Sequence, residues 1–306
     1  MDQDGSGQTL ARFGVAELVT SQPAHCLSGG KPQFMYLAGD GHQNLVSIEN
    51  PVRGYYERTD VVGGDNSWAD FQPFQSFPNV NPHDPNLKFV DIDGDGLADI
   101  LVSEDEVFAW YRSYGQQGFG SPQYARKPYD EERGAALLFA DPTQSIFMAD
   151  MTGDGLKDIV RIRSGEVCYW PNLGYGRFGA KITMDGSPSF DPPDTFDPRR
   201  VRLADIDGCG TTDILYLAAR GVAIYHNQSG NSWSEETTLA NFPALGNTGL
   251  VSAVDLLGNG TACLVWSSPL PADAGRQMRY IDLMGGQKPH LLIAIKNNLG
   301  AETRIR

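Results

Sequence analysis

Residues 89–102 read FVDIDGDGLADILV: a short apolar run, a turn rich in aspartate and glycine, and a second apolar run. Altered copies of this pattern recur along the 306-residue chain. The clear copies are FMADMTGDGLKDIVRI (147–162) and VRLADIDGCGTTDILYL (201–217), and the weaker ones are VSAVDLLGNGTACLVW (251–266), FMYLAGDGHQNLVSI (34–48) and the opening MDQDGSGQTLAR (1–12). Such self-similarity indicates an array of small units, none of which buries its apolar face alone.

The residues between the turns predict the architecture of each unit. Each copy provides two strands around its acidic turn, a third strand that ends in an aromatic residue, and a fourth after a glycine-rich link. Four short strands in roughly 50 residues are the content of one propeller blade, and six such blades need about 300 residues. No sustained helical periodicity of apolar residues is present. We therefore predict an all-β fold, a β-propeller of about six four-stranded blades over residues 1–270, followed by a short strand extension over 271–306.

Two long links between units, residues 63–88 and 184–200, are rich in proline, aspartate and aromatic residues. We expect ordered surface loops there, because large aromatic side chains need packing partners. The aromatic residues in question are Trp68, Phe71, Phe74, Phe77, Phe190 and Phe196.

The charge and composition exclude several classes of partner. The formal net charge is −14, which argues against nucleic acid and against anionic membrane surfaces. No apolar run approaches the roughly 18–20 residues that span a bilayer, so no membrane insertion is predicted. Met1 is followed at once by Asp2 and Asp4, so no classical secretory signal is recognised. The four cysteines are isolated, without a C-x-x-C, and the five histidines are scattered, so no zinc site is predicted.

The acidic turns are candidate cation sites. Calcium takes six to eight hard oxygen ligands in flexible geometry, and closely spaced carboxylates repel one another without a cation. Counting from the first turn position, oxygen ligands fall at positions 1, 3, 5 and 9. The candidate ligands are Asp91, Asp93, Asp95 and Asp99 in the strongest copy, Asp150, Thr152, Asp154 and Asp158 in the next, and Asp205, Asp207 and Asp213 in the third.

These turns differ from an EF-hand, because Val102 occupies the twelfth position, where that loop needs a glutamate, and strands rather than helices flank the turn. We therefore expect structural calcium in a β-hairpin loop of the kind found in FG-GAP or VCBS repeats. The alternative for every copy is an aspartate turn held by side-chain-to-backbone hydrogen bonds with no metal. The degenerate copies at 36–44 and 255–263 are expected to take that second form.

No catalytic residues are predicted. The chain contains no G-x-S-x-G elbow and no recognisable serine, histidine and aspartate order. A hydrolase that uses a pair of carboxylates is the remaining enzymatic alternative, because aspartate and glutamate are abundant.

Five long runs resemble a known family. They are GEVCYWPNLGYGRFG (165–179), RLADIDGCGTTDILYL (202–217), YHNQSGNSWSE (225–235), LLGNGTACLVWSSPLP (256–271) and YIDLMGGQKPHLL (280–292). On these residues the chain resembles the B component of Tc insecticidal toxins and, more broadly, the SpvB-like bacterial toxin family. The resemblance extends over about residues 30–306.

The resemblance implies a part of a larger, secreted or extracellular toxin complex. In that family a non-enzymatic β-propeller docks onto the channel-forming A component and gates the passage of a toxin. The toxin is enclosed in a shell of YD/Rhs-type repeats that the B component forms together with the C component. Residues 271–306 would then begin the shell. A metal-poor blade, around 251–266 or 34–48, is our candidate for the element that opens.

A second class of function stays open at this point. Propellers of this type also include fungal lectins and integrin heads, which bind glycans or cell-surface proteins. The aromatic segments 68–77 and 107–114 would suit stacking against a sugar. A glycan is therefore the alternative partner.

Overall fold

The computed structural model describes residues 2–3, 9–10, 19, 21–24, 33–48, 51–59, 67–141, 144–192, 195–240, 242, 249–297 and 299–305. Within these residues the regular structure is almost entirely β-strand. The exceptions are three single turns of 3-10 helix, Gly115–Gln117, Pro198–Arg200 and Pro271–Asp273. None of the helices in the described part of the chain is long and apolar enough to cross a membrane.

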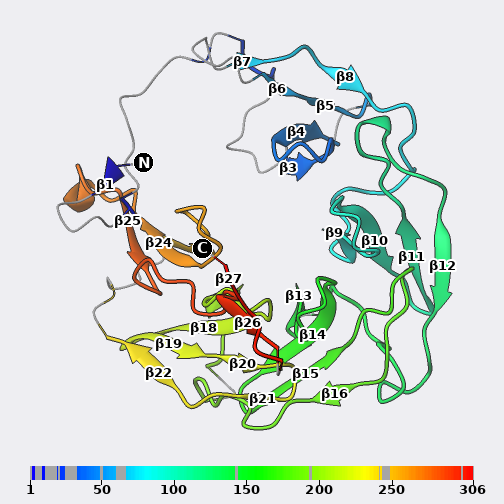
Figure 1. Ribbon diagram of the computed structural model, residues 1–306. Helices are drawn as coiled ribbons and strands as arrows, with labels where there is room; N and C mark the ends of the chain where they lie inside the picture. Colours follow the sequence, from blue (N-terminus) through cyan, green and yellow to red (C-terminus); the bar gives the residue numbers. More distant parts are fainter. Residues whose placement is uncertain are drawn as a thin grey trace.

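Five antiparallel sheets stand around a common centre and form a propeller (Figure 1). We number them blades 1 to 5 in chain order. Blade 1 contains β3 (Gln33–Tyr36), β4 (Gln43–Ser47), β5 (Gly54–Tyr56) and β8 (Gln72–Pro73). Blade 2 contains β9 (Leu87–Val90), β10 (Asp99–Ser103), β11 (Val107–Tyr111) and β12 (Gln123–Arg126). Blade 3 contains β13 (Ile146–Ala149), β14 (Asp158–Arg163), β15 (Glu166–Trp170) and β16 (Ile182–Thr183).

Blade 4 contains β17 (Val201–Ala204), β18 (Asp213–Ala218), β19 (Gly221–Tyr225) and β22 (Thr237–Leu239), and blade 5 contains β23 (Leu250–Val254), β24 (Cys263–Ser267) and β25 (Met278–Asp282). Four small hairpins accompany the blades. They are β1 (Asp2–Gln3) with β2 (Thr9–Leu10), β6 (Arg58–Thr59) with β7 (Ser67–Trp68), β20 (Asn227–Gln228) with β21 (Ser232–Trp233), and β26 (Ala294–Lys296) with β27 (Glu302–Arg304).

The all-β propeller is confirmed, but the predicted number of about six blades is wrong, because five blades are found in the described residues. In its described residues, the copy that starts at Asp2 contributes the hairpin of two-residue strands β1 and β2. The spacing of the turns gives the reason. Tyr36 follows Asp2 by 34 positions, whereas the spacings from Tyr36 to Asp255 are 50–59 positions. The opening copy therefore has too short a chain for four strands and their links. Most of residues 11–32 lie outside the described part of the chain.

The inner strands of the blades are apolar on both faces, because each blade packs between two neighbours. All five residues of β10 are buried, and five of the six residues in both β14 and β18 are buried. A continuous apolar run bounded by turns is the pattern expected for a strand covered on both sides. The strands thus place the core between blades rather than inside any one of them.

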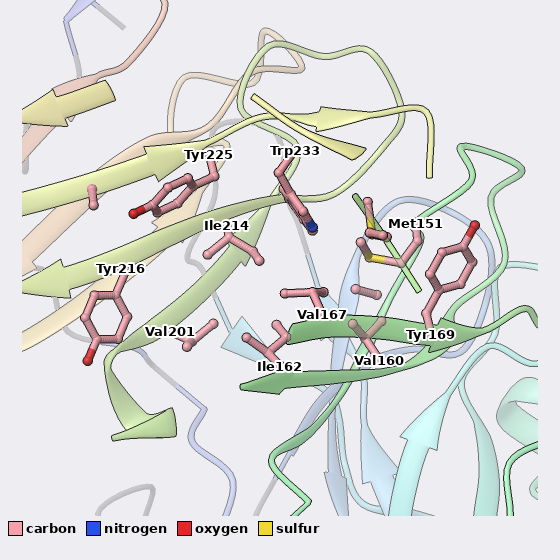
Figure 2. Packing of buried hydrophobic residues seen from close by; sticks show 13 residues of the cluster. Met151, Val160, Ile162, Val167, Tyr169, Val201, Ile214, Tyr216, Tyr225 and Trp233 are labelled. Carbon is pink, nitrogen blue, oxygen red and sulfur yellow. The ribbon is translucent and has the colours of Figure 1, made fainter. Parts of the chain in front are cut away.

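Figure 2 shows this packing between blades 3 and 4. Val160, Ile162 and Val167 of blade 3 point toward Val201 and Ile214 of blade 4. Burial of each such side chain stabilises the fold by roughly 1.5–3 kcal/mol. Similar buried clusters join blade 2 to blade 3 and blade 4 to blade 5.

Four aromatic residues of the long links, predicted to lie in surface loops, pack against the buried clusters of the blades. Phe74 and Phe77 are partly buried and pack against the buried cluster of blade 1 and that of blade 2, and so link these two blades. Phe190 and Phe196 stack on each other at 5.5 Å and pack on the cluster between blades 3 and 4. Aromatic pairs of this kind add about 0.5–1.5 kcal/mol beyond the area they bury.

The boundary between blades 5 and 1 differs from the boundaries between the other neighbouring blades. In the residues that the structure describes, no buried apolar cluster joins these two blades. The remaining cluster, of Leu257, Cys263 and Val265, lies within blade 5. We call the boundary between blades 5 and 1 the seam.

Blade 5 continues beyond residue 270, because β25 pairs with β24 along five residues, from Cys263 with Asp282 to Ser267 with Met278. The chain then forms the β26–β27 hairpin. The division at residue 270 into a propeller and the start of a shell stays a prediction.

Candidate cation site in the acidic turns

Each acidic turn joins the first strand of its blade to the second. The turns therefore lie at one rim of the ring. Their glycines at positions 4 and 6 have positive φ, for example 79° at Gly94 and 84° at Gly96. Residues with side chains rarely adopt this conformation, which explains the repeated glycines of the motif.

The carboxylate at turn position 1 folds the turn around itself. Asp91 accepts hydrogen bonds from the amides of Gly94 (2.7 Å) and Gly96 (2.9 Å). Two further turns repeat the pair: Asp150 with Gly153 (2.7 Å) and Gly155 (2.8 Å), and Asp205 with Gly208 (2.8 Å) and Gly210 (2.9 Å). Blade 5 keeps the second bond, from Gly260 to Asp255 at 2.8 Å. The first aspartate is thus structural in every blade that has it.

The carboxylate at position 9 connects the turn to the end of the third strand. Asp99 is fully buried and accepts from the amides of Ile92 (3.2 Å) and Ser113 (2.6 Å). The same two bonds recur at Asp158, from Met151 (2.9 Å) and Asn172 (2.8 Å), and at Asp213, from Ile206 (3.0 Å) and Asn227 (2.8 Å). In blade 1, the described residues give Asn44 one such bond, from the amide of Leu37 at 3.3 Å. Positions 1 and 9 therefore make the backbone hydrogen bonds of the metal-free alternative.

Burial destabilises the charged form of these position-9 carboxylates and so raises their pKa. It raises the pKa of Asp99 to about 7, although the amides of Ser113 and Ile92 favour the charged form. It likewise raises the pKa of Asp158 to about 6. Each of these groups is therefore poised to gain a proton or a cation near neutral pH.

Sequence reasoning missed the residues that link one turn to the next. The side-chain amide of Asn172 donates to the carbonyl of Ile92 in blade 2 (3.1 Å), and that of Asn227 donates to Met151 in blade 3 (3.0 Å). Both asparagines lie 14 positions after the buried aspartate of their own blade. That constant spacing is the signal that would have found them.

The turn of blade 2 fits a hard cation. Asp91, Asp93 and Asp99 each offer a carboxylate oxygen, and the three oxygens lie within 4.8 Å of one another. The side chain of Asp93 is 8% exposed, and its Oδ1 atom is buried without a hydrogen-bond partner. Burial and the charge of Asp95 raise the pKa of Asp93. A buried, unpaired oxygen beside two other carboxylates is the donor set that calcium prefers.

The two other predicted turns fit calcium less well. Among the described residues, the turn with Asp150, Thr152, Asp154 and Asp158 brings no three ligand atoms of acidic, histidine or cysteine side chains so close together. In blade 4, Asp205 and Asp207 converge with the thiol of Cys209, and Asp213 lies 3.3 Å from Nδ1 of His226. The structure also brings Nε2 of His290, 83 positions away, to 3.0 Å from Asp207. Thiol and imidazole groups are softer ligands than calcium selects.

Comparisons with known proteins agree with the repeat and the fold. Residues 91–160 match the family model of the FG-GAP-like repeat. A comparison with curated proteins gave no match. Among solved structures, a chain of the Photorhabdus luminescens Tc holotoxin pore is 28% identical with a TM-score of 0.74, over 94% of this chain and 13% of that chain. A chain of the TcdB2-TccC3-Cdc42 crystal structure is 26% identical with a TM-score of 0.52, over 90% of this chain and 15% of that chain.

A propeller of another class is also similar. A lectin of Agrocybe aegerita that recognises non-reducing terminal N-acetylglucosamine is 22% identical with a TM-score of 0.53, over 77% of this chain and 60% of the lectin. At this identity the likeness concerns the fold. The chain therefore has the β-propeller fold and resembles a small part, about an eighth, of much longer Tc toxin chains.

Proposed function

We propose that this chain is the β-propeller of a Tc-type toxin B component, which docks onto a channel-forming A component and gates the passage of the enclosed toxin without enzymatic activity. The likeness over 94% of the chain to part of a Tc holotoxin pore, at 28% identity and a TM-score of 0.74, carries this proposal. The C component and the remainder of the shell would be its other partners. The complex would act outside the producing cell.

The seam supports the gating step. A ring opens most easily where the smallest apolar area must be exposed to water. In the described residues three pairs of neighbouring blades (2 and 3, 3 and 4, 4 and 5) share a buried cluster, and the clusters of blades 1 and 2 are linked by the partly buried Phe74, Phe77 and Phe89. Blades 5 and 1 have neither kind of link in these residues. A channel subunit that binds the opened ring more tightly than the closed ring shifts the population by that difference in affinity. The two blades that flank the seam carry the degenerate turns 36–44 and 255–263.

Calcium is the proposed structural cofactor of the turn in blade 2. Asp91, Asp93 and Asp99 would hold it, and it would neutralise their mutual repulsion. Chelation with EDTA is expected to lower the melting temperature, because a ligand that binds only the folded state stabilises it. An unchanged melting temperature with EDTA and with added CaCl2 would remove tightly bound calcium from the proposal.

A glycan-binding propeller is the second candidate. Three tyrosines of blade 2 and its flanking loop are well exposed, namely Tyr114 at 54%, Tyr124 at 64% and Tyr129 at 93%. Exposed tyrosine rings suit stacking on a sugar. The similarity in fold to the lectin that recognises N-acetylglucosamine makes this sugar the first probe to use.

The two functions are separated by two binding measurements on the same preparation. Sedimentation velocity with a purified channel-forming Tc A component is expected to show a saturable complex with this chain. Isothermal titration with N-acetylglucosamine and its oligomers is expected to show no heat of binding. Sugar binding without a complex would reject the docking function and support the lectin-like one. A complex that forms equally with heat-denatured chain would also reject docking.

A further inference from the structure

Arg112 forms ion pairs with the candidate site in blade 2. It directly follows β11, at the end of the third strand. Its Nε lies 3.1 Å from Oδ2 of Asp93, and its Nη2 lies 3.2 Å from Oδ2 of Asp95. One guanidinium thus bridges two of the four aspartates of the turn. Its side chain is 42% exposed, so it reaches the turn from the solvent side.

The ion pair engages one oxygen of Asp93 and one oxygen of Asp95. Both oxygens of Asp95 are engaged, since Oδ1 accepts from the amide of Leu97 (2.9 Å) and Oδ2 pairs with Arg112. Asp95 lies outside the group of carboxylates whose oxygens converge, which are those of Asp91, Asp93 and Asp99. Oδ1 of Asp93 stays buried and unpaired. Arg112 therefore pairs with one aspartate inside the converging group, Asp93, and with one outside it, Asp95.

The equivalent positions in blades 3 and 4 do not have an arginine. The residue in question precedes the amide that binds the buried position-9 aspartate. It is Arg112 before Ser113 in blade 2, Pro171 before Asn172 in blade 3, and His226 before Asn227 in blade 4. Proline brings no charge to its turn, and histidine brings a charge only when protonated. Blade 2 alone of these three has a permanent positive charge at this position.

We propose that Arg112 is a built-in counter-ion that competes with an oxygen-binding divalent cation of the calcium class for Asp93 and Asp95. The inference rests on the proposed calcium site and adds the residue that sets its affinity. Release of Arg112 returns Asp95 to the ligand set and removes a positive charge close to the ion. The guanidinium is 42% exposed, so water can solvate it when it leaves the two aspartates. Arg112 thus lowers the cation affinity of the turn in blade 2, which has the most carboxylates of the three predicted sites.

Calcium titration of the full chain tests the competition. Arg112→Gln is expected to bind calcium about tenfold more tightly than the unsubstituted chain at low ionic strength, because one unit charge leaves the neighbourhood of a doubly charged ion. Arg112→Lys keeps the charge and is expected to bind with close to the original affinity. Arg199→Gln is the matched control, since it removes an arginine that is 90% exposed and paired with Asp197 outside this turn. It is expected to leave the calcium affinity unchanged.

Asp93→Asn tests whether the measured calcium binding belongs to this turn. Added to Arg112→Gln, the substitution is expected to abolish the tightened binding. Unchanged or weaker binding in Arg112→Gln would overturn the competition and leave the calcium site standing. Absence of calcium binding in both the original chain and Arg112→Gln would overturn the site as well as the competition. Neither outcome bears on docking, which the sedimentation experiment measures separately.

Discussion

Blades 2–4 and blades 1 and 5 use the same turn motif with different completeness. In blades 2–4 a buried aspartate at position 9 accepts two backbone amides and connects the turn to the third strand. Blade 1 has Asn44 at this position, and blade 5 has the buried thiol of Cys263. Yet both of these blades form, with strands in the same order.

The comparison shows that the apolar strands are enough to form a blade. The aspartates at position 9 add hydrogen bonds that hold the turn to the end of the third strand. The three complete blades are joined to one another by two large clusters of buried residues. The two incomplete blades flank the seam, where the described residues contain no shared cluster. In the part of the chain that the structure describes, the ring thus has blades joined by buried clusters and one boundary, the seam, without such a cluster, and we expect movement at the seam.

The largest expected effect is the loss of a position-9 aspartate. Asp158→Ala removes the acceptor of two buried amides, those of Met151 and Asn172. Leaving buried donors unpaired costs about 1–3 kcal/mol each, so we expect a destabilisation of about 2–6 kcal/mol in urea unfolding. Cys263→Ala in blade 5 is the comparison and is expected to cost about 1 kcal/mol, for one buried heavy atom. Equal effects of the two substitutions would contradict the fastening role.

A smaller destabilisation is expected from an alanine substitution in the turn of blade 4, which the segment 283–292 contacts through Lys288 and His290. Gly155 and Gly208 both have positive φ, of 89° and 74°, so alanine strains either backbone by about 1–3 kcal/mol. A Cβ at Gly155 meets nothing within 4 Å, whereas one at Gly208 would lie 2.7 Å from Cε of Lys288 and 2.8 Å from the carbonyl oxygen of Gly260.

Gly208→Ala is therefore expected to cost more than Gly155→Ala and to speed hydrogen exchange in residues 283–292. Gly155→Ala is expected to leave exchange in that segment unchanged. Identical stability and exchange for the two variants would show that the segment does not depend on its contact with the turn.

The melting temperature is expected to change by a few degrees with pH, because the buried Asp99 has a raised pKa in the folded chain. The pKa of Asp99 in the folded chain, about 7, lies above its ordinary value of about 3.9 in an unfolded chain. The folded state therefore binds the proton more tightly. The resulting stabilisation is complete below about pH 4 and is lost as the pH rises through about 7.

In EDTA we expect the melting temperature to fall between pH 5 and pH 7.5, and to fall less in Asp99→Asn. Calcium is expected to reduce the same slope, since it favours the charged carboxylate. A slope that is the same in Asp99→Asn and the original chain would assign the pH dependence to other groups.

Local pattern predicted the strands, the turns and their aspartates, because apolar runs and glycine positions act over a few residues. It predicted too many blades, because the opening copy has the motif but lacks the length of chain that a blade requires. It could not place Arg112 or His290 at the turns, since their contacts depend on how distant strands and segments pack. The seam was likewise invisible, because it depends on which clusters extend across a boundary.

Hydrogen exchange of the full chain, with and without a purified channel-forming Tc A component, tests the central claim most directly. If the propeller docks and opens at the seam, exchange should increase on binding in residues 33–56 and 250–282 and stay unchanged in the inner strands of blades 2–4. Equal protection in all five blades, or no change with a saturating amount of the channel subunit, would contradict the account.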